Sequence, residues 1–574
     1  MIMKMKIAKM EKTGKKASVS GEKGTGKEAD ESLFWADQIA RNVKQRVEES
    51  AALKKIIRER GYIIYDEKTP SGKIHIGSGR GWVIHDVIAK SMRGMGLKAR
   101  FILSSDDMDP FDKPNRDLPD SFNKYLGMPF RHVPSPVEGY KSFADYFFRQ
   151  CTDRFAEFGI KAELESTGQR YMNGDFNWAI KAVLDNSRKI DGIYTKFYGK
   201  PLGRLPFNPI CEKCGKIGTT LAYDWNGKNE LVSYRCEAEM AKWARGCGHA
   251  GKISPYNGGG KLPWKVEWAA KWPTVGVVCE LAGKDHFTKG GSRSISVAIC
   301  DQIFGFPPPY PSTTKDIGNG YEFFTVGGKK MSTSKGMGIG FAEMTGYLPA
   351  PMIRYLLVRT RPKARVDFDP MDENDMILLY DHFDRTQRIY HGAEKVEDRE
   401  FEQEKRIYEF SVIGEIGKKM PPQISLTYAA TIAQVSPDLE AAVKILKSTG
   451  HVPQNASTGD IQHVRKRLEY ARQWVEKLAP ERYRFRIQER PDVKLGPDVK
   501  KAVRSLAERL KAKEWAEGEL LNEVYAICKE NGVETKAFFR AVYNVLIGKD
   551  FGPRLAPFIL SIGKEKVAGL LEKA

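Results

Sequence analysis

The segment from Thr69 to Gly79 (TPSGKIHIGSG) combines glycines with a histidine in a way that suits phosphate binding. Glycines let a nucleotide approach the backbone closely, and a histidine can donate a hydrogen bond to a phosphate oxygen. A helix predicted to follow this segment would direct its amide donors and the positive end of its dipole at an anion. The alternative is an ordinary glycine turn that carries a surface histidine.

A second segment, Lys329 to Gly336 (KKMSTSKG), is rich in lysine and is flanked by further glycines on both sides. A glycine-hinged loop with three lysines can close over a triphosphate and neutralise the charge that develops on departing pyrophosphate. The alternative is an exposed hairpin whose lysines are only solvated.

Four of the eight cysteines lie between Cys211 and Cys247, in a pattern typical of a metal site. The Cys211-x-x-Cys214 turn places two thiolates on one side of a tetrahedral ion, and Cys236 and Cys247 can close the other side. We predict Zn²⁺ at these four residues, with His249 as the substitute fourth ligand and unmetallated cysteines as the alternative. Four protein ligands leave no open position for a substrate, so the predicted site is structural.

The elements predicted around the first segment form a βαβ unit of a parallel sheet. In order, the pattern predicts a helix at 31–47, a strand at 62–65, a glycine loop at 69–81, a helix at 82–92 and a strand at 99–103. Ligands of such sheets bind at the carboxyl ends of the strands. The glycine loop and the acidic cluster of Asp106, Asp107 and Asp109 should therefore face one crevice.

The predicted secondary-structure pattern changes twice in the rest of the chain. Residues 110–260 interrupt the alternation, and a strand-like run at 275–279 resumes the sheet. After Pro349 the pattern is helical almost to the end, with an irregular stretch at 448–460. Residues 1–30 form a predicted disordered basic arm; its near match to a P-loop is rejected because no apolar strand precedes it and Glu28 stands where a Ser or Thr is needed.

Composition limits the class of protein. The chain has 574 residues, 41% hydrophobic, and a formal net charge of +20, which excludes a disordered chain, a collagen and a small disulfide scaffold. No apolar run reaches the ~18 residues of a membrane helix. The basic excess fits a polyanionic partner or a merely solvated surface. Sparse cysteines and the absence of a secretory signal predict a reducing, cytoplasmic location.

The two phosphate-binding segments together resemble the HIGH and KMSKS signatures of the class I aminoacyl-tRNA synthetases. Ser78 stands in place of the last His of HIGH, and Thr333 in place of the second Lys of KMSKS. Further stretches, among them 264–268, 280–286, 351–359 and 548–558, are similar to the archaeal-type class I lysyl-tRNA synthetases. The resemblance covers roughly residues 31–574. It departs at Asp66-Glu67-Lys68, where the family often has a glycine.

The resemblance implies a fold of class α/β: a Rossmann-type parallel-sheet catalytic domain with a zinc-binding insertion, followed by an all-α anticodon-binding domain. The expected divisions are the arm at 1–30, the catalytic domain at 31–345, its insertion at about 110–260 with a zinc knot at 205–255, a helical junction at 346–400 and the anticodon-binding domain at 401–574.

The implied activity is that of a lysine–tRNA ligase, which joins lysine to AMP with release of pyrophosphate and then transfers lysyl to the terminal adenosine 2′-hydroxyl of tRNA(Lys). The expected catalytic residues are His75, Lys330 and Lys335, with Mg²⁺ accompanying ATP. The expected ATP-binding residues are Pro70, Gly72, His75, Gly77, Ser78, Gly79, Asp285, Lys330, Ser332 and Ser334. The resemblance implies lysine contacts at Thr69, Trp264, His286 and Tyr321, and the need to pair an ammonium adds Asp109 and Glu280. The alternative for Trp264 and Tyr321 is ordinary core packing.

Three rival functions remain: a class I synthetase for another amino acid, a small-molecule adenylyltransferase and a non-catalytic tRNA-binding paralogue. The zinc knot and the basic helical tail disfavour the second, and the presence of His75 with the lysine loop disfavours the third. The expected partners are tRNA(Lys), lysine and ATP, with no DNA, no membrane and a monomer favoured. The resemblance also places the chain near synthetases that activate their amino acid only when tRNA is bound.

Overall fold

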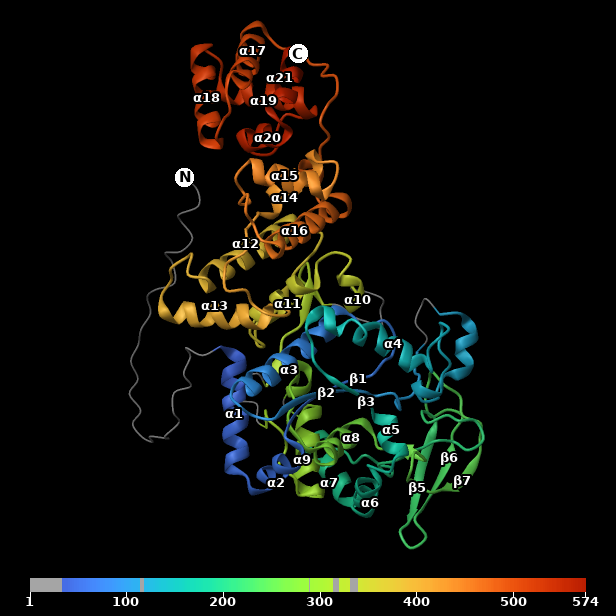
Figure 1. The fold of residues 1–574 in the computed structure, drawn as a ribbon. Coiled ribbons are helices and arrows are strands. Elements are labelled where there is room, and N and C mark those ends of the chain that lie inside the picture. The colour runs from blue at the N-terminus through green and yellow to red at the C-terminus, as the bar shows by residue number, and fades with distance from the viewer. Residues whose placement is uncertain (1–33, 114–117, 289, 313–318, 331–338) are drawn as a thin grey trace, which may run out of the picture.

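The computed structural model describes residues 34–113, 118–288, 290–312, 319–330 and 339–574. An α/β body forms its larger part, and the C-terminal helices extend away from that body in an elongated arm (Figure 1). The predicted basic arm at 1–30, with its rejected P-loop match, lies outside the described residues. So do Ser332, Ser334 and Lys335, and Lys330 is described by its backbone alone.

The centre of the body is a parallel sheet of β1 (Tyr62–Lys68), β2 (Ala99–Ser105), β3 (Glu163–Ser166) and β9 (Val277–Cys279). Its strand order is β3-β2-β1-β9, so the chain leaves β1 towards one edge and later returns to the other side of β1. Such a reversal opens a crevice at the carboxyl ends of the strands. The helix α3 (Ile76–Gly94) connects β1 to β2, which confirms the predicted βαβ unit.

Helix α1 (Trp35–Glu49) packs against α3 through the face that its sequence predicts. Trp35, Ile39, Val43 and Val47 are all buried, because a spacing of four residues keeps them on one side of a helix. The Trp35 indole N–H also donates to the Val358 carbonyl at 2.9 Å. This bond connects α1 to α11 (Ala350–Arg359), the helix in which Val358 lies.

Helix α3 begins earlier than predicted, so the expected glycine loop at 69–81 is wrong in its second half. Gly77, Gly79 and Gly81 lie in the first turns of the helix. A Cβ atom on Gly79 would come within 2.3 Å of the Phe341 ring. Gly79 therefore serves close packing rather than loop flexibility.

The strand predicted at 275–279 is also shorter than expected. Trp272–Gly276 forms a π-helical turn that ends at Gly276 with φ +87°, and β9 starts only at Val277. The alternation predicted to stop at 110–260 is not fully interrupted either, because β3 lies inside that segment and pairs with β2. The four-residue strand is too short and too polar to stand out in the sequence.

The C-terminal part contains two hydrophobic cores. Helices from α11 (Ala350–Arg359) to α16 (Thr458–Lys477) share the core of the α/β body, whereas those from α17 (Pro497–Ala512) to α21 (Lys564–Lys573) surround a separate core. The predicted change to a helical pattern after Pro349 is thus confirmed. Arg467 of α16 forms a buried ion pair with Asp384 at 2.7 Å, which fixes α16 to α12 (Glu373–Tyr390).

The remaining elements complete this arrangement. The other strands are β4 (Asn208–Pro209), β5 (Thr220–Asn226), β6 (Leu231–Cys236), β7 (Ala250–Ile253), β8 (Gly260–Lys261), β10 (Ala282–Gly283), β11 (Gly320–Tyr321), β12 (Phe324–Val326), β13 (Lys329–Lys330) and β14 (Val366–Asp367). The other helices are α2 (Ala51–Arg60), α4 (Phe143–Thr152), α5 (Thr167–Met172), α6 (Asn177–Asp185), α7 (Ser187–Tyr198), α8 (Trp264–Lys271), α9 (Ser292–Phe304), α10 (Phe341–Met344), α13 (Asp398–Ser411), α14 (Leu426–Val435), α15 (Leu439–Ser448), α18 (Glu517–Glu530), α19 (Thr535–Ile547) and α20 (Leu555–Ile562).

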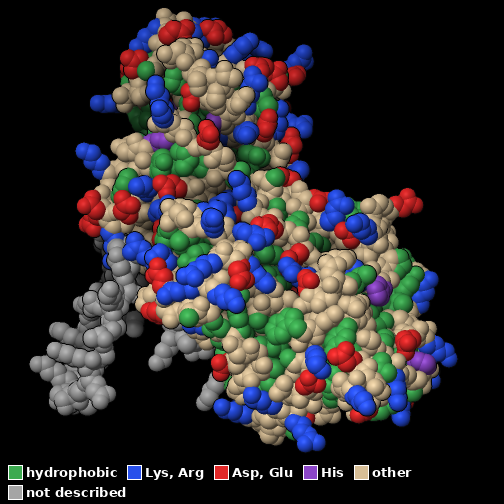
Figure 2. Space-filling model, turned by 60° about the horizontal axis from the view of Figure 1, so that its bottom comes forward, with side chains coloured by type: hydrophobic (Ala, Val, Ile, Leu, Met, Phe, Trp, Pro, Cys, Tyr) green, Lys and Arg blue, Asp and Glu red, His purple; other side chains and the backbone are tan. Residues whose placement is uncertain are grey.

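The surface is basic without being uniformly so. On the face seen in Figure 2, Lys and Arg side chains lie over both the body and the helical arm, with acidic side chains between them. Within the described ranges, every helix is too short or too polar to cross a membrane.

Candidate active site

A cavity of about 460 Å³ opens at the carboxyl ends of β1, β2 and β9. All six residues predicted to bind lysine line it: Thr69, Asp109, Trp264, Glu280, His286 and Tyr321. Ser78 of the predicted ATP site lines it as well. The crevice expected from the strand order is therefore present, and residues from distant parts of the sequence meet in it.

One wall of the cavity is aromatic. Trp264 is 46% exposed, which contradicts ordinary core packing for this side chain. It stacks on Trp268 with ring centroids 6.3 Å apart, and the His286 ring lies edge-on to Trp268 at 5.3 Å. Burial lowers the pKa of His286, so this ring is neutral near pH 7. The wall offers flat apolar faces to an alkyl chain or a base.

The acidic side of the cavity is already neutralised by buried lysines. The Lys261 ammonium lies 2.5 Å from Asp109, 3.0 Å from Asp106 and 3.2 Å from Glu267. Burial, and then the charge of Asp106, raise the pKa of Asp109 to about 6. The Thr69 hydroxyl donates to the same Asp109 carboxylate at 3.1 Å.

A second buried ammonium, that of Lys271, lies between Glu67 and Glu267. It is 2.6 Å from Glu267 and is also paired with Glu67. Glu67, Asp106 and Glu267 have oxygens close enough together for a metal ion. The ammonium groups of Lys261 and Lys271 lie among these oxygens, so the chain's own cations fill that role.

Glu280 is also compensated within the chain. Its carboxylate accepts hydrogen bonds from the indole N–H groups of Trp268 at 2.8 Å and Trp272 at 2.5 Å, and it pairs with Arg293 at 3.2 Å. Of the acids expected to face the crevice, Asp107 does not. It accepts hydrogen bonds from the Gly168 backbone N–H and the Ser166 hydroxyl, and so holds the start of α5.

Two acids that line the cavity, Asp66 and Glu67, were not predicted from the sequence, and Glu67 pairs with Lys271. Asp66, near the end of β1, lines the cavity beside Tyr321. A signal for it exists in the sequence. Side chains of a strand alternate between faces, so Asp66 follows buried Tyr62 and Ile64 on the same side of β1, and an acid there ends a buried run.

The predicted catalytic histidine lies at the start of α3. His75 is the residue immediately before the helix, where backbone amides point towards a bound anion. It forms an antiparallel β-bridge with Gly340, just beyond the lysine-rich loop. Because β12 pairs with β13, which begins that loop, both flanks of the loop are anchored in the α/β body.

The other residues predicted to bind ATP are spread around the start of α3. Gly77 and Gly79 lie in the first turn of α3, whereas Pro70 and Gly72 are buried beneath the preceding turn. Asp285 is exposed on the short helical turn Lys284–Phe287. Ser78 is the member of this group that lines the cavity.

Arg80, one turn into α3, connects the site to the helical part. Its buried guanidinium donates to five backbone carbonyls, those of Glu322, Phe323, Arg361, Pro362 and Ala364. The same region pairs β12 with β14, which precedes α12. The start of α3, the base of the lysine-rich loop and the approach to the helical arm are therefore one hydrogen-bonded unit.

The comparisons with known proteins agree with this geometry. Residues 33–414 match the family model described as tRNA synthetases class I (K), and residues 427–574 match an anticodon binding domain. The chain belongs to the class I tRNA synthetase (K) family.

Several archaeal proteins are similar to this synthetase over nearly its whole length. The lysine–tRNA ligase of Archaeoglobus fulgidus is 31% identical over 94% of this chain and 100% of its own. Those of Thermococcus kodakarensis and Methanosphaera stadtmanae are 32% and 30% identical, each over 93% of this chain and 98% of its own.

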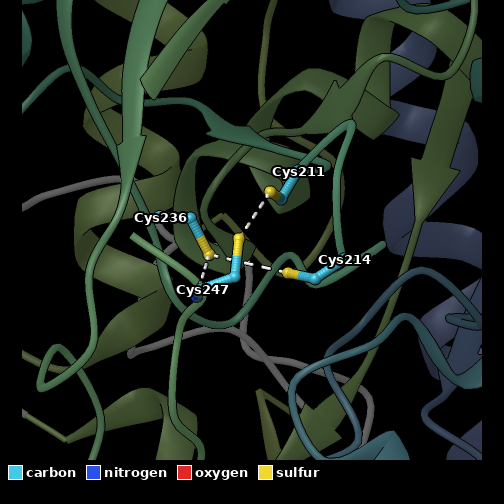
Figure 3. Close-up of side chains that lie close together, drawn as sticks. All are labelled: Cys211, Cys214, Cys236 and Cys247. Atoms are coloured by element: carbon cyan, nitrogen blue, oxygen red, sulfur yellow. Dashed lines mark hydrogen bonds between the residues drawn. The ribbon is translucent and has the colours of Figure 1, made fainter. Parts of the chain in front are cut away.

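The four predicted zinc ligands of the synthetase converge in space. Their side chains point towards one another from the loop before β5, the end of β6 and the loop before β7 (Figure 3). The Sγ atoms of Cys211 and Cys247 are 3.6 Å apart, and those of Cys214 and Cys236 are 3.7 Å apart. Four thiolates at the Zn–S distance in a tetrahedron are about 3.8 Å from one another, so the set fits zinc.

The surroundings of the cluster also suit thiolates. The Cys247 backbone N–H donates to Cys236 Sγ at 3.4 Å, and the Thr219 hydroxyl lies 3.3 Å from the same sulfur. The His249 ring packs edge-on against Tyr234 with centroids 6.1 Å apart, and it is not a member of the cluster. The structure therefore favours Cys247 over His249 as the fourth ligand.

Proposed function

We propose that this synthetase is a lysine–tRNA ligase. It joins lysine to AMP from ATP with release of pyrophosphate, and it transfers the lysyl group to the terminal adenosine 2′-hydroxyl of tRNA(Lys). The observation that carries the proposal is the meeting of Thr69, Asp109, Trp264, Glu280, His286 and Tyr321 in one cavity, which Ser78 of the first motif also lines. The curated relatives named lysine–tRNA ligase support it over nearly the full chain.

We assign the chemistry to positioning and charge stabilisation. His75 and the first amides of α3 hold the triphosphate, and Lys330 and Lys335 neutralise the departing pyrophosphate. Mg²⁺ enters with ATP and offsets phosphate charge. Zn²⁺ on the four cysteines holds the knot around β5, β6 and β7 together and takes no part in the reaction.

The partners follow from this assignment. The domain at 427–574 binds the anticodon of tRNA(Lys), and basic and aromatic side chains between 465 and 486 are the candidates for base and phosphate contacts. A cluster of cysteines that serves as a metal site requires reduced thiols, so we place the enzyme in the cytoplasm.

A charging assay with the purified full chain, ATP, Mg²⁺ and total tRNA, run with each of the twenty amino acids, tests the proposal. We expect acid-precipitable product with lysine. Product with a different amino acid would identify a synthetase of other specificity. An adenylate that forms but never reaches tRNA would favour a small-molecule adenylyltransferase, and tRNA binding without either reaction would favour the non-catalytic paralogue.

A further inference from the structure

Asp66 differs from the other carboxylates of the cavity in its charge partners. Glu67, Asp106, Asp109 and Glu280 each form an ion pair with a lysine or arginine of the chain. In the part of the chain that the structure describes, no lysine or arginine nitrogen lies within 4.0 Å of Asp66. Its side chain is nevertheless only 14% exposed. The cavity therefore contains one nearly buried carboxylate that lacks a cation.

The ring beside Asp66 does not supply that cation. His85 Nδ1 lies 3.4 Å from the Asp66 carboxylate, and the same nitrogen donates to the Gly81 carbonyl at 2.7 Å. The Leu281 backbone N–H donates to Nε2 at 3.0 Å, which requires a lone pair on that atom. Burial by itself would lower the pKa of His85. The charge of Asp66 and the hydrogen bonds to Asp66 and Gly81 outweigh burial, so the net shift of the pKa is upward. Protonation of Nε2 would still remove the acceptor of Leu281, so the neutral ring fits the geometry.

Gly81 lets Asp66 and Tyr321 approach the backbone of α3 closely. A Cβ atom at this position would lie 2.7 Å from the Tyr321 hydroxyl oxygen and 3.0 Å from Asp66 Oδ2. The Asp66 carboxylate oxygen and the Tyr321 hydroxyl oxygen therefore lie side by side against the bare backbone of residue 81. Two oxygens, one of them charged, are what an ammonium group needs when it leaves water.

We propose that Asp66 and the Tyr321 hydroxyl bind the ε-ammonium of the substrate lysine, and that Gly81 is required because a side chain there would displace these two oxygens. This inference rests on the proposed function and adds to it the residue that selects the substrate's charge. The lysines of the chain neutralise the neighbouring acids, so the substrate ammonium has one carboxylate to pair with. A side chain without a charge would leave Asp66 buried and unpaired, and would be rejected for that reason.

The first test compares the full-length wild type with Asp66→Asn in steady-state charging of tRNA. We expect the KM for lysine to rise roughly 10²-fold, the size of effect that loss of a charged hydrogen bond produces, while the KM values for ATP and tRNA stay unchanged. Norleucine, which has the same four-carbon side chain without the ammonium, is the matched competitor. The preference for lysine over norleucine should fall by a similar factor in Asp66→Asn, which a general weakening of the fold would not produce.

The second test uses two glycines of the same helix. Gly81→Ala presses a methyl group against both oxygens of the proposed site, and we expect it to raise the KM for lysine at least as much as Asp66→Asn does. Gly94→Ala is the control, because a Cβ there meets nothing within 4 Å. Alanine favours helix over glycine at both positions, so neither variant should unfold α3.

The outcomes separate this inference from the proposed function. If the wild type charges tRNA with lysine while Asp66→Asn and Gly81→Ala keep the wild-type KM for lysine, the inference is overturned and the function stands. A rise in KM that leaves the ratio of lysine to norleucine unchanged also overturns it, because the site would then be merely distorted. If the wild type does not accept lysine at all, the proposed function fails and this inference fails with it.

Discussion

His75 and Gly340 form an antiparallel β-bridge that fastens the start of α3 to the segment after the lysine-rich loop. The Ile76 N–H donates to the Ile339 carbonyl at 3.0 Å, and the Phe341 N–H donates to the Ile74 carbonyl at 2.8 Å. Backbone hydrogen bonds therefore join the first of the two motifs predicted to bind phosphate to the segment that follows the second. Substitutions in either motif should affect the same chemical step.

Replacing His75 with alanine should slow adenylate formation roughly 10²–10³-fold, because one preorganised phosphate donor is lost. Its backbone bridge to Gly340 does not depend on the side chain, so the thermal unfolding midpoint should stay close to that of the wild type. Single-turnover formation of lysyl-adenylate, followed in the presence of tRNA, measures the effect. Near wild-type turnover in this variant would remove His75 from the site.

The cysteine cluster should bind one zinc ion per chain. Cys247→Ser should lose the metal and unfold the knot around β5, β6 and β7, whereas His249→Ala should retain it, because the His249 ring packs on Tyr234 outside the cluster. Metal analysis after gentle purification, with both variants in parallel, is the measurement. A metal-free wild type, or zinc that depends on His249 instead of Cys247, would contradict the assignment.

Amino acid activation should depend on tRNA. The Arg80 contacts and the pairing of β12 with β14 connect the lysine-rich loop to the helical arm, so tRNA docked on that arm can shift the loop towards its active arrangement. Lysine-dependent exchange of pyrophosphate into ATP, measured with and without cognate tRNA, tests this. Rapid exchange in an RNA-free preparation would show that the site is assembled without tRNA.

The stability of the α/β body should carry a pH signature from Asp109. Burial and the charge of Asp106 raise the pKa of Asp109 from 3.8 to about 6. The folded state therefore holds this proton more tightly than the unfolded state, so the stability that Asp109 contributes falls as the pH rises from about 4 to about 6 and is gone above that range. At ~1.4 kcal/mol per pKa unit, the loss amounts to at most about 3 kcal/mol.

Asp109→Asn cannot ionise and should lack this decline. Thermal unfolding, followed by the fluorescence of tryptophans such as Trp264 and Trp268, compares the two proteins across the acid range. The slopes with pH are the readout, because the substitution also changes the contact with Lys261. Parallel pH profiles for wild type and variant would mean that Asp109 titrates normally in the folded protein.

The sequence predicted which residues line the cavity better than it predicted how their charges are paired. The apolar strand before Thr69 and the acids after β2 gave the βαβ unit and the crevice, because these signals are local. Lys261 lies more than 150 residues from Asp106 and Asp109, the two crevice acids with which it pairs, so no spacing rule indicates it. Asp66 follows buried Ile64, which is a signal in the sequence, but what sets it apart from the other acids is its lack of a nearby lysine or arginine within the described ranges, and only the structure shows that.

The early start of α3 escaped prediction for a related reason. Glycines ordinarily argue against a helix, and Gly77, Gly79 and Gly81 follow one another closely. Gly79 contacts Phe341 and Gly81 contacts Tyr321, both far along the chain. These contacts leave no room for a side chain at either helical position. Tertiary packing here overrides local propensity, and it does so at the functional site.

Arg80 also determines when the catalytic body can be completed during synthesis. Its carbonyl acceptors lie between 242 and 284 residues further along the chain, so the ribosome releases α3 long before the groups that surround this guanidinium exist. A buried charge without partners is strongly destabilising, so the emerging βαβ unit cannot close its core in the native form by itself. The body therefore matures late and as a whole, and nascent chains that stop before Ala364 should be preferred clients of chaperones and proteases.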